Sequence, residues 1–122
     1  MSDLTVSVTA SGSKGYWSDQ LQWSFSTDMT AGASHCPTVD VGTSEEALVV
    51  GDLSGVEGFI ALRNLDATNF VTWGPESGGA MVAIGKLLPL GEPAIFRMKP
   101  GVTLRLKADT AACKVQVKLF YK

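Results

Sequence analysis

Residues 102–122 read VTLRLKADTAACKVQVKLFYK, and this stretch decides the fold class. On both sides of a short segment around Asp109, apolar residues alternate with polar ones. Period-two alternation is typical of β-strands that bury one face, whereas a helix repeats its apolar positions every three to four residues. The stretch therefore predicts a closing β-hairpin with one apolar face and one face rich in lysine and arginine.

The same alternation continues through most of the chain. The longest candidate helix, around residues 43–50, is too short and too rich in β-branched residues to favour a helix. The segments expected to be strands are residues 4–9, 21–26, 39–41, 47–50, 58–62, 69–73, 80–88, 94–99, 102–109 and 113–121. Two sheets packed face to face cover so many one-sided strands best. We therefore predict an all-β fold, a jelly-roll-like antiparallel β-sandwich of eight to ten short strands.

Length and composition fit one domain spanning residues 1–122. The chain is 45% hydrophobic, enough for one ordinary core, and only 18% charged, below the usual quarter. The N-terminus has no basic region followed by an unbroken apolar run, and no apolar stretch is long enough to span a membrane. We expect a soluble protein that is not exported by a cleaved signal and has no membrane partner.

The net charge of −2 hides an uneven distribution. Residues 1–96 carry 11 acidic and 3 basic side chains, whereas residues 97–122 carry 7 basic and 1 acidic. A basic stripe on adjacent strands would attract nucleic acid or an acidic protein surface. Nucleic-acid readers of β type usually add exposed aromatic side chains, and only Phe120 qualifies on this face. We therefore favour a solvated or protein-facing stripe over a nucleic-acid site.

The candidates for metal or thiol chemistry are few. Cys36 and Cys113 have no CxxC partner or local ligand set, so we expect two free thiols with Cys113 in the core; a disulfide between them is the less favoured alternative. His35 is the sole histidine, and adjacent residues of an extended chain point to opposite faces, which disfavours a Cys–His pair with Cys36. We expect His35 to lie exposed in a loop, and we expect no metal and no cofactor.

Carboxylates leave an enzymatic alternative open, because a glycosidase needs two carboxyl groups about 5–10 Å apart across a cleft. The acids considered are Glu45, Glu46, Asp66, Glu76 and Glu92. The short chain leaves little length for loops that enclose a substrate, so we expect the protein not to be an enzyme. Gly78 and Gly79 lie in PESGGAM, which lacks the P-loop lysine and helix start and predicts a hairpin turn.

The segment RNLDATN at 63–69 places polar side chains between two expected strands. Asn and Asp accept left-handed backbone conformations and bond their own turn amides, so we favour a turn built by Asn64, Asp66 and Asn69. A calcium loop would carry more oxygen ligands than the one acid present here.

Two segments resemble small virion structural proteins of tailed bacteriophages. They are FIALRNLDATNFVTWG at 59–74 and KLLPLGEPAIFRMKPGVTLRLKADTAACKVQVKLFY at 86–121. In the family that they resemble, a segment like RNLDATNYV precedes LKAGE, a strand, a proline-glycine turn and a closing strand. The resemblance covers roughly residues 57–122, and the chain departs from it in the basic final strand KVQVKLFYK at 114–122.

The resemblance implies an all-β subunit that acts through assembly and has no catalytic residues. We expect a capsid decoration or cement protein on the virion surface, assembled in the host cytoplasm, that binds the major capsid protein and stabilises the head. Homo-oligomers of two, three or more copies would fit the symmetry axes of a shell. The expected contacts are the segment before Leu4 and the side chains of Arg63, Asn64, Asp66, Asn69, Arg105, Lys107, Lys114 and Lys118.

Two rival functions stay open. A tail or head-spike component would present loops to a host receptor or glycan, and exposed Trp17 and Trp73 side chains would support that role. We expect both rings in the core instead, because Trp73 follows Phe70 and Val71 in a strand pattern. A small β-sandwich enzyme would need a pocket in which ionisable groups with perturbed pKa values converge.

Overall fold

The computed structural model describes residues 4–28, 34–48, 59–97, 99 and 101–120. These ranges contain twelve strands and no helix, and thus no helix suited to crossing a membrane. The strands are β1 (Leu4–Lys14), β2 (Trp17–Thr27), β3 (Ser34–His35), β4 (Thr38–Val41), β5 (Glu46–Ala47), β6 (Phe59–Asn64), β7 (Val71–Ser77), β8 (Ala80–Met81), β9 (Gly85–Leu87), β10 (Pro93–Arg97), β11 (Leu104–Ala108) and β12 (Cys113–Phe120). The all-β prediction is confirmed, and the strand count exceeds the predicted range because three strands have only two residues.

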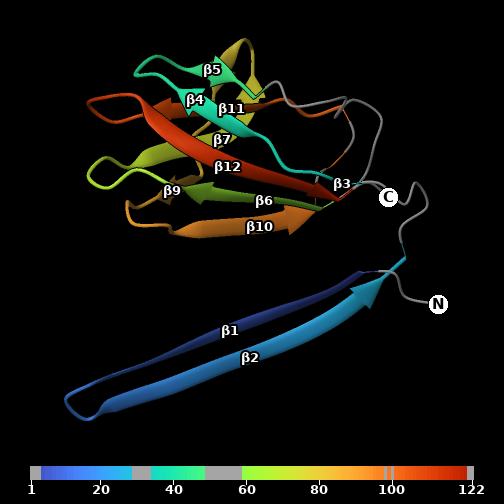
Figure 1. Ribbon diagram of the computed structural model, residues 1–122, viewed down its shortest axis with the longest axis vertical. Coiled ribbons are helices and arrows are strands. Elements are labelled where there is room, and N and C mark those ends of the chain that lie inside the picture. Colours follow the sequence, from blue (N-terminus) through green and yellow to red (C-terminus); the bar gives the residue numbers. More distant parts are fainter. Residues whose placement is uncertain (1–3, 29–33, 49–58, 98, 100, 121–122) are drawn as a thin grey trace.

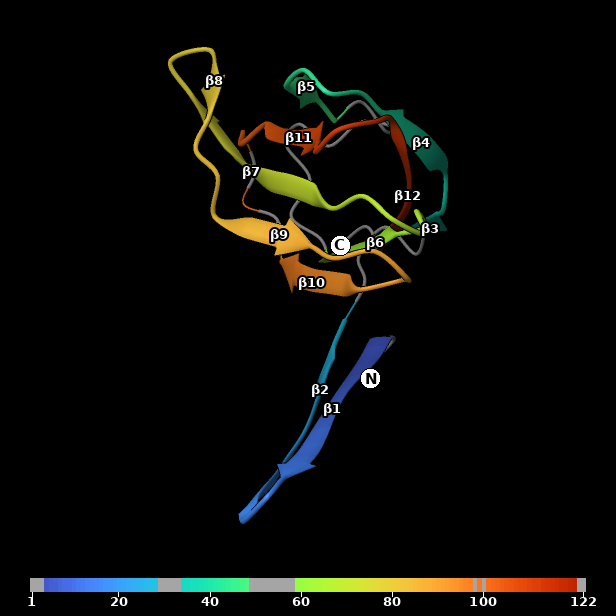
Figure 2. The ribbon, with the colours of Figure 1, turned by 90° about the vertical axis from the view of Figure 1, so that its left-hand side faces the viewer.

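The strands from β3 to β12 form two facing antiparallel sheets (Figures 1 and 2). In the first sheet the order is β10-β6-β12, and both β3 and β4 pair with the other edge of β12. In the second sheet the order is β5-β11-β7, and both β8 and β9 pair with the other edge of β7. Successive strands alternate between the sheets from β4 to β7 and from β9 to β12, which is the strand order of a jelly roll. The predicted sandwich is confirmed.

The core lies between the two sheets because the longer strands turn their apolar sides inward. The central strands β6 and β12 face β7 and β11, and their inward side chains are almost fully buried. The core side chains are Val41, Leu48, Ile60, Leu62, Val71, Leu87, Leu104, Leu106, Ala108, Cys113, Val115, Val117 and Leu119. The prediction of two free cysteines is confirmed, with Cys113 buried in this core and Cys36 exposed.

The last two strands correct an expectation from the sequence. Alternation predicts that β11 and β12 form one hairpin, but they lie in opposite sheets and present their apolar faces to each other across the core. Their basic faces therefore point outward on opposite sides of the body, with Arg105 and Lys107 on one side and Lys114 and Lys118 on the other. The predicted continuous basic stripe is wrong, because alternation shows which side of a strand is buried but not which strand lies beside it.

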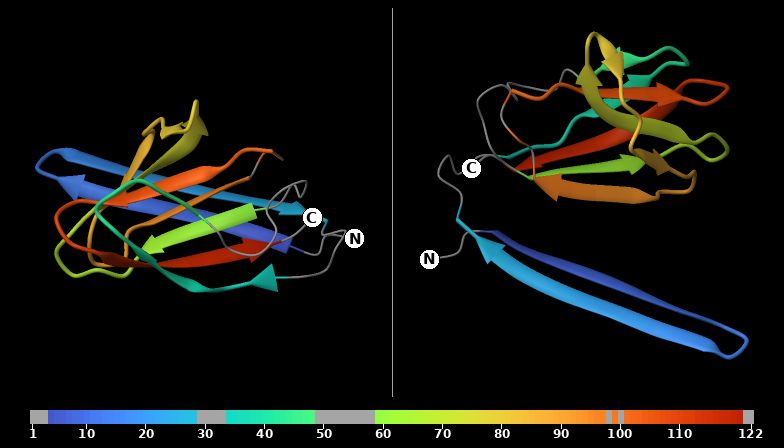
Figure 3. Two further views of the ribbon diagram at one scale, coloured as in Figure 1. Left: turned by 90° about the horizontal axis from the view of Figure 1, so that it is seen from above. Right: turned by 180° about the vertical axis from the view of Figure 1, so that it is seen from behind.

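Strands β1 and β2 form a separate hairpin that projects from the sandwich (Figures 1 and 3). Its base contacts the body, where the Phe25 and Phe59 rings are 5.3 Å apart and the Arg97 guanidinium donates to Thr27 Oγ1 at 3.4 Å. The expectation of strands half-buried in the sandwich is wrong farther along the hairpin, where the Trp23 residue is 66% exposed. The core prediction for Trp17, which is 57% exposed, is also wrong.

Other local predictions had mixed outcomes. The PESGG turn is confirmed, since Gly78 and Gly79 have φ angles of 63° and 82° and join β7 to β8. Trp73 is partly buried against the core and stacks on Phe96 with ring centroids 5.0 Å apart, as expected. His35 lies in β3 rather than in a loop. The segment before Leu4, and the expected strand positions 49, 50, 58, 98 and 121, lie outside the described residues.

Candidate interaction surfaces

Asn64, at the end of β6, is fully buried and makes three hydrogen bonds. Its Nδ2 donates to the carbonyl oxygens of Asn69 and Leu87 at 2.9 and 3.0 Å, and its Oδ1 accepts from the Asp66 amide at 2.9 Å. Buried polar groups are stable only when they are bonded in this way. The structure thus assigns Asn64 a structural role, in place of the partner contact expected from the sequence.

Asp66 builds the turn that follows. Its Oδ2 accepts from the backbone amides of Thr68 and Asn69 at 3.0 and 2.6 Å, and from the Thr68 hydroxyl at 3.3 Å. The bonds from the Asn69 and Thr68 amides hold the pKa of the Asp66 carboxyl below its ordinary value, because they favour the charged form. The turn interpretation of RNLDATN is therefore confirmed, with the carboxylate occupied by its own loop.

Three loops meet at one end of the body, at the left in Figure 1, and we call residues 65–70, 88–92 and 109–112 the loop platform. The Leu90 amide donates to the Asp66 carbonyl at 2.9 Å, which joins the first two loops. The Thr110 hydroxyl donates to Asn69 Oδ1 at 2.6 Å, which joins the first and third. These bonds fix the relative positions of loops that are far apart in the sequence.

The loop platform carries exposed leucines. Leu65 and Leu88 are each 45% exposed, and Leu90 is 82% exposed. Leu90 also has a φ of 72°, a left-handed conformation that is uncommon for residues other than Gly, Asn and Asp. Strained backbone of this kind concentrates at functional positions. Sequence reasoning missed these leucines, although LLPLG at 87–91 places apolar side chains in a turn where polar ones are usual.

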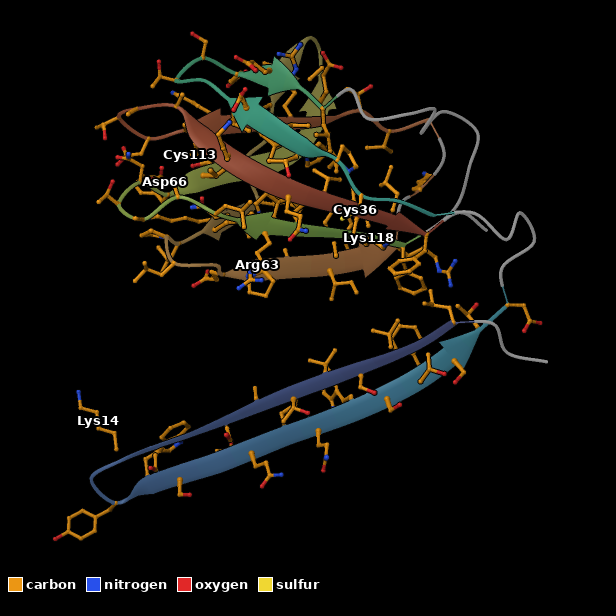
Figure 4. The ribbon with its side chains drawn as sticks, viewed as in Figure 1. Lys14, Cys36, Arg63, Asp66, Cys113 and Lys118 are labelled. Carbon is orange, nitrogen blue, oxygen red and sulfur yellow. The ribbon has the colours of Figure 1, made fainter. Side chains whose placement is uncertain are left out.

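Arg63 lies at the edge of this platform. Its Nε donates to the Gly91 carbonyl at 3.2 Å. Gly91 has a φ of 92°, and a Cβ there would lie 2.8 Å from the guanidinium, so glycine suits both the turn and the arginine. Arg63, Cys36 and Lys118, labelled in Figure 4, also line one shallow pocket of about 280 Å³ on the first sheet. The structure thus brings two of the expected contact residues together.

The other expected basic contacts are dispersed. Arg105 forms a partly buried ion pair with Glu76 at 2.7 Å, and Lys114 forms an exposed one with Asp40 at 2.9 Å. Exposed pairs like the second contribute about 0–1 kcal/mol. The Lys118 ammonium lies 5.4 Å from the centre of the ring of its own strand neighbour, Phe120. No single basic surface joins these side chains, since they lie on opposite sides of the sandwich.

The described ranges include all five acids considered from the sequence. There, no group of three or more His, Cys, Asp or Glu side chains is placed to hold a metal ion. Among the acids considered above, Glu76 pairs with Arg105 and Glu45 accepts from the Met81 amide at 3.0 Å. These contacts give both carboxylates structural partners.

Replacing Asn64 tests its structural role. Asn64→Ala should lower the free energy of unfolding by about 3 kcal/mol, because one buried carbonyl, one partly buried carbonyl and one amide lose their partner. Asn69→Ala, a matched change five positions away, removes two exposed hydrogen bonds, to Thr68 and Thr110, and should cost about 1 kcal/mol or less. Urea denaturation of both variants measures the difference, and equal losses would contradict the assigned role.

The lowered pKa of Asp66 predicts that the stability of the protein depends on pH. Its folded-state pKa lies below the ordinary 3.8, so the ionised carboxylate stabilises the fold at neutral pH. That contribution is lost as pH falls from about 4 through the folded-state pKa. Asp66→Asn should therefore be less stable than the natural protein at pH 7, and the difference should shrink towards pH 2. A difference that stays constant in denaturation curves across that range would argue against the charged turn.

Comparison with protein-family models gave no match, and neither curated proteins nor solved structures matched the chain. The strand order is that of a jelly roll, an architecture that viral capsid domains, lectin domains and cupins share. One fold hosts many functions, so a role has to be argued from the surfaces described above.

Proposed function

We propose that the protein is a structural component of a bacteriophage virion, a capsid decoration or cement protein that binds the outer surface of the major capsid protein lattice and stabilises the head. The resemblance of residues 57–122 to virion structural proteins supports this role. The jelly roll supports it by fold-level analogy, since viral capsid domains use the same architecture.

The observation that carries the proposal is the apolar side chain of Leu90, held almost fully in solvent by a strained backbone. An exposed leucine on a strained backbone makes the isolated fold less stable. A partner that buries this side chain would offset that loss of stability. Leu65 and Leu88 are further exposed apolar side chains of the same loop platform. Burying these leucines in a pocket on the shell would stabilise the complex by about 1.5–3 kcal/mol for each fully covered side chain.

Charged groups around the loop platform would set the orientation on the shell. The exposed Arg63 is bonded to Gly91, the exposed Glu92 lies in the same loop as Leu90, and the exposed Asp109 lies in the loop 109–112. Rim charges act mainly on specificity and on the rate of association. A shell repeats the same contact at every equivalent site, so a modest free energy per copy raises the resistance of the whole lattice.

A sedimentation experiment with shells that lack the protein tests this role. The natural protein should bind saturably at a fixed stoichiometry, and Leu90→Asn should bind at least about tenfold more weakly, as expected for a central apolar contact. Asn accepts the left-handed backbone, so this variant should fold normally. Ile84→Asn, which changes a 67% exposed residue at the other end of β9, serves as the control. Absence of co-sedimentation, or equal binding by both variants, would overturn the proposal.

A second candidate function is favoured by the aromatic tip of the hairpin. Tyr16 is fully exposed and Trp17 is more than half exposed, and exposed aromatic rings suit recognition of a host receptor or glycan. A tail or head-spike component would use them. In that case the isolated protein should bind host cells, Trp17→Ser should weaken this binding by about tenfold, and Leu90→Asn should leave it unchanged. Pull-down with cells separates this candidate from shell decoration.

A further inference from the structure

The β1–β2 hairpin has two chemically different faces. Directly paired residues of antiparallel strands point to the same face, and the register pairs Val8 with Trp23 and Ala10 with Leu21. The apolar face is formed by Leu4, Val6, Val8, Ala10, Gly12, Leu21, Trp23 and Phe25, with Lys14, Trp17, Asp19 and Thr27 at its ends. Lys14, on this face, extends towards the side on which the body lies (Figure 4).

The opposite face carries only hydroxyl and amide side chains. Its members are Thr5, Ser7, Thr9, Ser11, Ser13, Ser18, Gln20, Gln22, Ser24 and Ser26. Cross-strand pairs bond to each other, with 3.1 Å between the hydroxyls of Thr5 and Ser26 and 3.5 Å between those of Ser7 and Ser24. This face suits water, whereas the apolar face does not.

The apolar face is open beyond the base of the hairpin. Val6 is buried and Phe25 contacts the body, but Trp23 and Trp17 are 66% and 57% exposed. An isolated two-stranded hairpin is marginally stable in water, and contiguous exposed apolar surface marks an interaction site. A partner that covers this face would therefore stabilise the hairpin as well as the complex.

The strand edges point to the same conclusion. Eleven residue pairs run without a bulge, neither strand contains a proline, and the only charges are Lys14 at the turn and Asp19. Natural proteins protect exposed strand edges with charges, prolines or bulges, and these devices are nearly absent here. The exposed hairpin therefore lacks the usual protection against contact with another chain.

The apolar face is complementary to itself in shape. Gly12 has no side chain and the Trp17 ring lies over it, since a Cβ on Gly12 would be 2.9 Å from that ring. A shallow pocket of about 220 Å³ with a mainly apolar surface lies here, lined by Ala10, Ser11, Gly12, Trp17, Asp19, Gln20 and Leu21. A cavity of about 150 Å³ accommodates benzene, so this pocket has room for an aromatic side chain. Trp23 protrudes from the same face, next to Leu21 in the alternation.

We propose that two copies of the chain pack through the apolar faces of their β1–β2 hairpins, with the Trp23 ring of each copy in the Gly12–Trp17 pocket of the other. In an isologous interface, both copies use the same surface. A two-fold axis between the pocket and Trp23 therefore generates both contacts, each between Trp23 of one copy and the pocket of the other. The two hairpins then form a small two-layer sandwich, the arrangement that covers one-sided strands in the body.

Area and charge favour a second copy as the occupant. Aromatic side chains bury about 150–250 Å² each. At the exposed fractions of Trp17, Trp23 and Phe25, these three residues leave about 300 Å² of surface accessible to solvent in each copy. Two copies bring about 600 Å² from these rings, and the aliphatic side chains extend the area towards the roughly 1,000 Å² that a specific interface needs. Each face carries one Lys and one Asp, so two copies meet without net repulsion.

This pairing goes beyond the proposed virion role and does not depend on it. Shell binding is assigned to the leucines of the loop platform, whereas self-association is assigned to the hairpin. Failure of one therefore leaves the other standing, because Leu90→Asn tests the first and Trp23→Ser tests the second.

Sedimentation velocity of the purified full-length protein over a micromolar concentration series tests the pairing. The natural protein should form dimers, and the dissociation constant of Trp23→Ser should rise at least about tenfold, as for a Trp at the centre of an interface. Tryptophan emission should shift to shorter wavelength as dimers form, because Trp17 and Trp23 leave water. Circular dichroism confirms that the variants are folded.

Two matched variants serve as controls. Ile84→Ser removes an equally exposed apolar side chain from the body, and Ser24→Ala alters the opposite face of the hairpin next to Trp23. Both should dimerise like the natural protein. A chain that stays monomeric throughout the series, or dimers that Trp23→Ser leaves unchanged, would overturn the pairing and assign the apolar face to a different protein.

Discussion

Most strands of the body have one apolar side, and each sheet keeps that side from water only by packing on the other sheet. This constraint separates β11 from β12, although they are consecutive and carry the same alternation. It also requires most connections to cross from one sheet to the other, so several crossing loops meet at one end. The loop platform is therefore a consequence of how the core is closed, and its leucines are the apolar residues that this closure leaves outside.

The hairpin shows what happens when the same constraint is not met within one chain. β1 and β2 alternate as regularly as β11 and β12, but among the described residues no second layer faces them beyond their base. The contacts of Phe25 and Thr27 with the body hold only that base. Because this long part is uncovered, we propose that the hairpin mediates self-association, whereas the loop platform binds a different partner.

The alternation of apolar residues was enough to predict most of the strands, the two-layer architecture and the burial of Cys113. It did not predict β3, and it predicted one strand over residues 80–88 where the structure has β8 and β9. It could not predict strand neighbours, since a strand such as β12 presents the same pattern to any partner. Turn chemistry predicted the role of Asp66 and of Gly78 and Gly79, because these act within a few residues. The burial of Asn64 and the exposure of Leu90 depend on loops brought together by tertiary structure, which no local pattern contains.

The polar face of the hairpin is insensitive to pH and to salt. The face made of serine, threonine and glutamine has no group that gains or loses a proton between acid and alkaline media, and added electrolyte has no fixed charge there to screen. Its hydration is thus set by neutral dipoles alone. On a virion of the kind proposed, this surface would stay in the same state when the pH or the salt concentration changes.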